Sequence, residues 1–137
     1  MRNMAFSITT EQMYAQTKSV TRRLGWSFLK PGDVVMAVEK GMGLKKGEKV
    51  KQIYPIEIVS IRGERLSDIT LEDVAREGFP QMNVPEFVRM FAKSHGCDVH
   101  ECVNRIEFKP LAQPNKAYTR QGGTPARKEN PTNDVEV

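Results

Sequence analysis

The chain is organised around the stretch Thr17-Lys18-Ser19-Val20-Thr21-Arg22-Arg23, which the turn Pro31-Gly32-Asp33 follows. The stretch places an amine, three hydroxyls and two guanidinium groups within seven residues. In the turn, proline fixes one φ angle and glycine permits the backbone that a tight reversal requires. Candidate reactive groups are therefore concentrated in one short segment, and a predicted tight turn follows it.

The backbone of this stretch is expected to be extended, because Val20 and Thr21 are β-branched. Side chains of an extended segment alternate between faces, so Ser19, Thr21 and Arg23 share one side. Lys18 lies at the strand entrance, where its long stem can curl back towards Thr21. A hydroxyl near an amine that has lost its proton is one form of nucleophile and base. The alternative is a solvated basic strand, because exposed Lys and Arg are the norm.

Length and composition indicate one globular domain. The 137 residues are 39% hydrophobic and 28% charged, which suits a soluble chain with a buried core. No apolar run approaches the ~20 residues that span a bilayer, and residues 1–10 lack a signal-peptide core. We therefore expect a cytoplasmic protein with no membrane partner, no cofactor and no obligatory protein partner. Two cysteines are too few for a disulfide framework.

Positive charge is concentrated in residues 18–51, although the net charge of the chain is only +4. That range holds nine basic and three acidic residues. Within it, the loop 40–51 contains five lysines, among them Lys45 and Lys46, and three glycines. Such a patch attracts a phosphate-bearing partner. A solubilising lysine-rich loop explains the same pattern.

The hydrophobic pattern predicts short strands and a few helices. Besides the opening segment, strands are expected at residues 5–8, 34–39, 53–61 and 103–108. Helices with their caps are expected at residues 9–17, 70–77 and 83–96. Arg62-Gly63-Glu64 is expected to interrupt the chain after the longest strand.

These elements indicate a mixed α+β fold. Five to six short strands with two or three flanking helices suggest a small, partly closed β-barrel. The domain is expected to cover residues 1–110. Periodicity disappears after that point, so residues 111–137 are expected to form a flexible tail.

Trp26 is the only tryptophan of the chain. Its ring suits either a core anchor or a platform on which a nucleobase stacks. We expect the core role and keep Trp26 as a candidate substrate contact.

All histidines and cysteines of the chain lie in one eight-residue segment, at His95, Cys97, His100 and Cys102. Cys and His are the preferred ligands of zinc. Their spacing is not that of the usual Cys-x-x-Cys site, and the segment follows a helix stop, where turn residues are expected. We therefore predict no metal, with a buried thiol and surface imidazoles, and keep a zinc site at these four residues as the alternative.

Several motifs together resemble the ASCH (activating-signal-cointegrator homology) domain. They are, in chain order, Lys18-Ser19-Val20-Thr21-Arg22-Arg23, Pro31-Gly32-Asp33, Glu77-Gly78-Phe79 with Glu86-Phe87-Val88, and Arg105-Ile106-Glu107-Phe108. The resemblance covers residues 4–110 and rests on the order and spacing of these motifs. The sequence departs from the family pattern at Ser19, where Thr is usual, and at Arg22, where an apolar residue is common.

The resemblance implies a PUA-like barrel, a fold that binds RNA, with a pocket where the K-x-x-T-x-R segment meets a later acidic residue. Some compact bacterial members of the family remove the acetyl group from 4-acetylcytidine with a Lys, a Thr and a Glu. These residues map onto Lys18, Thr21 and Glu77, so the resemblance implies an amidohydrolase. The residues expected to contact the nucleoside or RNA are Ser19, Arg22, Arg23, Trp26, Lys45 and Lys46.

In such a reaction Thr21 would attack the acetyl carbonyl and Lys18 would take its proton. A free lysine has a pKa near ~10.4, so Lys18 must be desolvated or lie beside cations such as Arg22 and Arg23. Glu77 would orient Lys18 or shuttle protons.

Two other functions are consistent with the same residues. In a non-catalytic RNA-binding module, the basic residues would contact phosphates, and Trp26 or Tyr54 would stack on a base. In a ribonuclease of the ASCH type, Lys18 and Glu77 would serve as acid and base.

Overall fold

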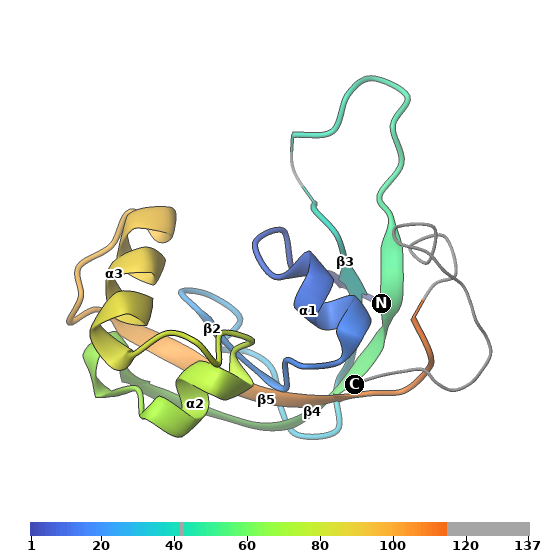
Figure 1. The fold of residues 1–137 in the computed structure, drawn as a ribbon. Coiled ribbons are helices and arrows are strands. Elements are labelled where there is room, and N and C mark those ends of the chain that lie inside the picture. Colours follow the sequence, from blue (N-terminus) through green and yellow to red (C-terminus); the bar gives the residue numbers. More distant parts are fainter. Residues whose placement is uncertain (42, 115–137) are drawn as a thin grey trace. The chain divides into compact units, whose positions relative to one another are not determined.

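The computed structural model describes residues 1–41 and 43–114 (Figure 1). Its chain divides into two compact units. Unit one comprises Met1–Thr17, Val34–Glu57 and the described residues from Lys109 onward. Unit two comprises Lys18–Asp33 and Ile58–Phe108. Most of the expected tail, residues 115–137, lies outside the described residues.

The secondary structure confirms the expected mixed α+β class. The strands are β1 (Asn3–Ala5), β2 (Val20–Arg23), β3 (Val34–Val38), β4 (Gln52–Arg65) and β5 (Cys102–Pro110). The helices are α1 (Thr10–Ala15), α2 (Leu71–Arg76) and α3 (Val84–His95), with a 3-10 turn η1 (Leu66–Asp68). The hydrogen-bonded order of the strands is β1-β3-β4-β5-β2. In the described part of the chain the edge strands β1 and β2 do not pair, so the sheet is open where a partly closed barrel was expected.

Unit one is built from β1, β3 and the first part of β4, together with α1. β1 runs parallel to β3, and β3 runs antiparallel to β4, with Val35 opposite Ile56. The Tyr54 hydroxyl donates to the backbone carbonyl of Met13 at 2.6 Å, which joins β4 to α1. Burial of this hydroxyl raises the pKa of Tyr54.

β1 ends earlier than the predicted strand at residues 5–8. The Phe6 amide still donates to the Val38 carbonyl at 2.9 Å, but the Thr10 hydroxyl donates to the Phe6 carbonyl at 2.7 Å. Such a side-chain bond competes with strand pairing. The chain therefore leaves the sheet at Phe6 and begins α1.

β4 is longer than predicted, because it continues through Arg62-Gly63-Glu64 to Arg65. A glycine inside a regular element costs about 0.5–1 kcal/mol. Hydrogen bonds to the next residue offset that cost. The Glu64 carboxylate accepts from Arg22 Nε at 3.0 Å and Nη2 at 2.7 Å, and from Arg62 Nε at 3.3 Å.

In unit two, β2 runs antiparallel to β5, with Thr21 opposite Ile106. The predicted turn follows β2: the Asp33 amide donates to the Lys30 carbonyl at 3.0 Å. Gly32 lies at φ 93°, a left-handed conformation that glycine adopts without steric cost. The sequence therefore predicted both β2 and its exit.

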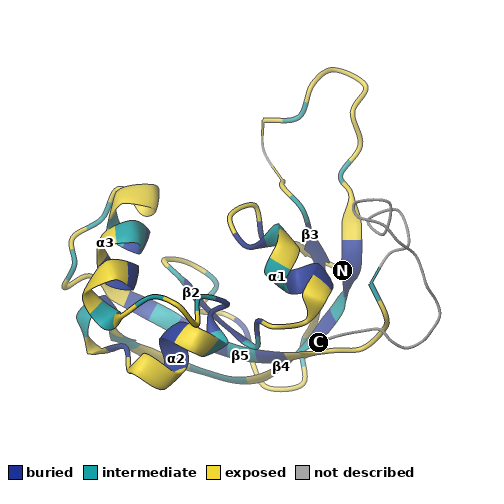
Figure 2. Ribbon diagram, viewed as in Figure 1, coloured by how far each residue is buried: buried dark blue, intermediate teal, exposed yellow. Residues whose placement is uncertain are grey.

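Unit two has an apolar core formed by η1, α2, α3 and β5. Its buried members are Leu66, Ile69, Val74, Phe87, Val88, Phe91 and Val103. Three of these come from α3 with the predicted helical spacing, and Figure 2 shows that α3 has one buried face and one exposed face.

The caps of α2 and α3 agree with the sequence prediction. The Thr70 hydroxyl accepts from the Asp73 amide at 3.1 Å. Asn83 and Glu86 form a reciprocal capping box, with both bonds at 2.8 Å. Gly96 ends α3 in a left-handed conformation at φ 63°. Local signals therefore fix where these helices begin and end.

Leu66→Ala is expected to lower the free energy of unfolding by about 2–5 kcal/mol, because it leaves a cavity among packed side chains. Urea denaturation followed by circular dichroism measures this change. Leu71→Ala is the matched control, since Leu71 is 63% exposed, and its effect should stay within about 0.5 kcal/mol. Equal losses in the two variants would contradict the assignment of the core.

Candidate active site

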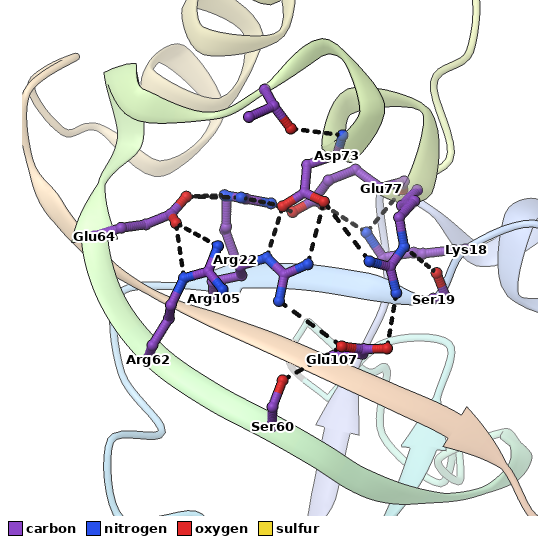
Figure 3. Close-up of polar contacts among 12 residues, drawn as sticks. Lys18, Ser19, Arg22, Ser60, Arg62, Glu64, Asp73, Glu77, Arg105 and Glu107 are labelled. Carbon is purple, nitrogen blue, oxygen red and sulfur yellow. Dashed lines mark hydrogen bonds and ion pairs between the residues drawn. The ribbon is translucent and has the colours of Figure 1, made fainter.

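The segment before β2 lies against the last turn of α2. The Ser19 amide donates to the Arg76 carbonyl at 2.9 Å. The Lys18 side chain reaches Glu77, the residue that ends α2: its Nζ donates to Oε1 at 2.8 Å and to the Glu77 backbone carbonyl at 2.8 Å (Figure 3). Two of the three candidate catalytic residues, 59 positions apart, are therefore in direct contact.

The contact between Lys18 and Glu77 is shielded from water, since the two residues are 5% and 3% exposed. The alternative of a solvated lysine is therefore wrong. Burial lowers the pKa of Lys18 below its ordinary value, because the ammonium loses its hydration. The Glu77 carboxylate opposes this shift, and the charges of Arg23 and Arg22 add to it. Lys18 is thereby predisposed to lose its proton.

Thr21 is buried on β2, and its Oγ1 accepts a hydrogen bond from Arg23 Nε at 3.2 Å. This contact confirms that the two side chains share one face of the strand. Among the residues that the structure describes, Thr21 has no hydrogen bond to Lys18 or Glu77. Arg23 connects the three electrostatically, because its charge lowers the pKa of Lys18 and it interacts with Glu77.

Arg23 is half-buried and remains a cation. Burial lowers its pKa to about 10, which is still well above neutral pH. A permanent positive charge therefore lies beside the Thr21 hydroxyl.

Arg22, which we expected to contact a substrate, is 2% exposed and binds three carboxylates of the chain. Its Nη1 donates to Glu77 Oε2 at 3.0 Å, and its Nη2 donates to Asp73 Oδ2 at 2.6 Å. Its Nε and Nη2 both donate to Glu64 Oε2 (Figure 3). The guanidinium group is therefore fixed between β4 and α2.

Asp73 is the second branching point of the cluster. Besides Arg22, it accepts from Arg105 Nε at 2.6 Å and Nη2 at 3.2 Å. Burial raises the pKa of Asp73, but the hydrogen bonds and charges of Arg105 and Arg22 outweigh this effect and hold the pKa well below its ordinary value. Asp73 therefore stays ionised and ties β2 and β5 to α2.

Ser19 contacts the outer side of the same cluster. Its Oγ accepts from Arg76 Nε at 3.1 Å, and Arg76 Nη2 donates to Glu107 Oε2 at 2.9 Å. Arg76 and Glu107 are partly exposed. The serine hydroxyl therefore binds α2, with solvent near by.

Sequence reasoning missed several members of this cluster, namely Glu64, Asp73, Arg76 and Arg105. The sequence around Asp73 indicates a helix cap, and its amide does bind Thr70, but its carboxylate makes the longer-range contacts. No local pattern announces a carboxylate that is shared by two arginines from distant strands. The one sequence feature that could have indicated a buried charge cluster was Arg22 itself, because it is charged at a position where the family resemblance implied an apolar residue.

Trp26 is half-buried in the loop after β2, so the expectation of a core anchor is wrong. Its ring packs against the exposed Phe28 with centroids 5.5 Å apart and planes inclined by 38°. The backbone of Trp26 is left-handed, at φ 73°. Asn104 Nδ2 donates to the Gly25 carbonyl at 2.7 Å and ties this loop to β5.

The candidate zinc ligands make other contacts. His95 stacks on Phe91 with centroids 3.9 Å apart, and His100 Nδ1 is paired with Ser67 Oγ at 3.2 Å. Both imidazoles are exposed, as expected, but Cys97 is only half-buried and Cys102 is exposed, so the expected buried thiol is wrong. Within residues 1–41 and 43–114, no group of three or more His, Cys, Asp or Glu residues is arranged to hold a metal ion.

Lys45 and Lys46 are exposed in the loop between β3 and β4 of unit one. Their contact with phosphates stays a prediction. As for membranes, none of the helices in the described segments has the length and apolar character needed to cross a bilayer.

Comparison with known proteins identifies the fold. No family model matches the sequence, and no curated protein does so either. Among solved structures, hypothetical protein PH0355 is 18% identical, with a TM-score of 0.56 over 81% of this chain and 100% of that one. Protein EF3133 from Enterococcus faecalis V583, of family DUF984, is 9% identical, with a TM-score of 0.54 over 77% of this chain and 71% of that one.

An ASCH domain from Lactobacillus crispatus JV V101 is 13% identical, with a TM-score of 0.47 over 80% of this chain and 79% of that one. The chain shares the fold of PH0355 and of EF3133. At these identities the likeness concerns the fold alone, so the function of this protein must be argued from its own side chains.

Asp73→Asn is expected to lower the free energy of unfolding at pH 7 by about 3–5 kcal/mol, because it removes one partner of a buried charge cluster. The difference from the unmodified protein should shrink as the pH falls below about 4. Asp73 has a lower pKa folded than unfolded, so its stabilisation is present above the unfolded value and lost towards the folded one.

Urea denaturation at a series of pH values measures both effects. Glu72→Gln is the matched control, because Glu72 is the exposed neighbour of Asp73 on α2. A difference that stays constant from pH 7 to pH 3, or a Glu72 variant that behaves like the Asp73 variant, would contradict this account.

Proposed function

We propose that this protein is an ASCH-type amidohydrolase that removes an acyl group from a modified cytidine such as 4-acetylcytidine. The observation that carries the proposal is the environment of Lys18 Nζ. In the described chain, Nζ has two hydrogen-bond acceptors, Oε1 and the backbone oxygen of Glu77. A neutral amine has two N–H groups and one lone pair. The uncharged form therefore satisfies both acceptors and leaves its lone pair to take a proton.

Thr21 is the proposed nucleophile. A cation beside an oxygen stabilises the alkoxide that forms as the hydroxyl loses its proton, and Arg23 donates to Thr21 Oγ1 at 3.2 Å. Lys18 takes that proton as the base. Substrate binding has to bring the Thr21 hydroxyl and the Lys18 amine together. Catalytic hydrogen bonds are often long in a free enzyme and shorten only in the complex with substrate.

The proposed reaction has two halves. Thr21 Oγ1 attacks the acetyl carbonyl carbon, the C–N bond breaks, and the Lys18 ammonium returns its proton to the departing cytidine amine. Water then attacks the acetyl-threonine ester while Lys18 again accepts a proton, and acetate leaves as the hydroxyl is restored. Glu77 directs Nζ and stabilises the transient ammonium in both halves.

The aromatic pair Trp26–Phe28 is the proposed platform for the cytosine base. It follows β2 directly, three residues after Arg23, and Phe28 is exposed. Stacking on an aromatic side chain contributes about 1–3 kcal/mol per base.

The protein is expected to convert 4-acetylcytidine to cytidine and acetate, and Thr21→Ala should reduce kcat by at least about 100-fold, because the acyl acceptor is removed. Chromatography of the nucleosides measures the reaction. Thr21→Ser keeps a hydroxyl and should retain part of the activity. Thr17→Ala is the matched control: it deletes an exposed threonine hydroxyl just before the candidate site and should leave kcat unchanged.

Full turnover by folded Thr21→Ala would remove the proposed nucleophile. No turnover by the unmodified protein, with salt-dependent binding of single-stranded RNA, would favour the non-catalytic module instead. That second function draws specific support from the exposed aromatic loop and from the exposed Lys45 and Lys46.

The pH dependence of kcat gives a separate prediction. Because only the unprotonated amine accepts a proton, kcat is expected to rise with pH through the titration of Lys18 and then level off. Burial lowers the pKa of Lys18, so the midpoint of the rise should lie below the ordinary lysine value of about 10.4. Steady-state rates from pH 5 to about pH 10.5 measure it. A profile that falls with pH over this range would contradict Lys18 as the base.

A further inference from the structure

We infer that Arg22 is a positioning residue for Lys18: its guanidinium group, held between three carboxylates, fixes Glu77 beside the neighbouring amine and disfavours the protonated form of that amine. This inference rests on the proposed function, in which Lys18 acts as a base. It assigns to Arg22 a role other than contact with the substrate.

The carboxylate of Glu77 lies between two cationic groups. Lys18 Nζ binds Oε1 at 2.8 Å, and Arg22 Nη1 binds Oε2 at 3.0 Å. With Oε2 held by the arginine, the carboxylate cannot turn away from the amine. The negative charge of Glu77 also interacts with Arg22, so it stabilises a protonated Lys18 less than it would if Lys18 were its only partner. Arg22 therefore both places Glu77 and weakens its hold on a proton at Nζ.

Arg22 is itself immobilised. Glu64 accepts hydrogen bonds from Arg22 Nε at 3.0 Å and from Nη2 at 2.7 Å, and Asp73 accepts one from Nη2 at 2.6 Å. Asp73 is fixed in turn by two bonds from Arg105, at 2.6 and 3.2 Å. The planar guanidinium suits this arrangement, because it presents donors in a rigid fork, whereas the ammonium of lysine is a single point charge.

The charges around Lys18 balance when the amine is neutral. The cations are Arg22 and Arg23 from β2, Arg76 from α2 and Arg105 from β5. The anions are Glu64 from β4, Asp73 from α2, Glu77 at the C-terminal end of α2, and Glu107 from β5. Arg62 also contacts Glu64 but is 62% exposed, so water screens its charge. A proton on Lys18 adds one uncompensated positive charge to this enclosed group.

Arg22→Met is expected to raise the titration midpoint of Lys18 by about one pH unit, because a nearby cation disappears and Glu77 is left to Lys18 alone. If the amidohydrolase proposal holds, kcat at a pH well below both midpoints falls about tenfold while the plateau at high pH is largely retained. The direct readout is the 13Cε chemical shift of Lys18 against pH, assigned with the Lys18→Met variant. Arg62→Met is the matched control, since it removes an exposed arginine bound to the same Glu64 and should leave the midpoint unchanged.

A second variant guards against loss of the fold. The double substitution Arg22→Met with Glu64→Gln removes one cation together with the anion that it binds through two donors. The Lys18 midpoint should rise in this variant as well. A midpoint that stays the same or falls in either folded variant overturns the inference.

The spectroscopic titration does not depend on catalysis. If the unmodified protein shows no turnover but the Lys18 midpoint rises in Arg22→Met, the proposed function fails and the electrostatic role of Arg22 stands. If turnover is present but the midpoint does not move, the proposed function stands and the role of Arg22 fails.

Discussion

A single buried guanidinium group, that of Arg22, joins the parts of unit two that carry the candidate site. It bonds to Glu64 on β4, to Asp73 on α2 and to Glu77 at the end of that helix. α2 has only six residues and could not hold a defined position on its own propensity. The arginine and the apolar core fix the helix from two directions, and Glu77, the residue that caps its C-terminal end, then meets Lys18. The placement of Glu77 is therefore a consequence of charge pairing around β2.

Burying so many charges adds little net stability. Removing ions from water costs several kcal/mol for each, and their mutual attraction often only restores that loss. What the cluster does supply is a fixed orientation of its side chains, since every carboxylate in it accepts a hydrogen bond from a defined donor. It also supplies an electrostatic surrounding in which an ammonium group is disfavoured. Those two properties matter for proton transfer, where the geometry and the charge of one nitrogen decide the outcome.

Features of this structure that depend on residues close together in the sequence could be predicted, and those that depend on distant residues mostly could not. The caps at Thr70 and Asn83, the turn at Gly32 and the extended β2 are encoded by neighbouring residues, and the sequence predicted all of them. The meeting of Lys18 with Glu77 came from a family resemblance, because nothing local connects residues so far apart. The partners of Arg22 were not foreseen, since a charged residue in a β-branched stretch looks like a solvent-facing one. The open sheet and the half-buried Trp26 likewise depend on tertiary packing, which amphipathic periodicity does not specify.

Trp26 has a practical consequence because it is the only tryptophan of the chain. Its indole ring lies half-buried against Phe28 in the loop that follows β2. The tryptophan fluorescence of the whole protein therefore reports from one place, a few residues beyond Thr21 and Arg23. A heterocycle that stacked there would alter the emission of that ring, so the molecule carries its own optical probe for occupancy of this loop.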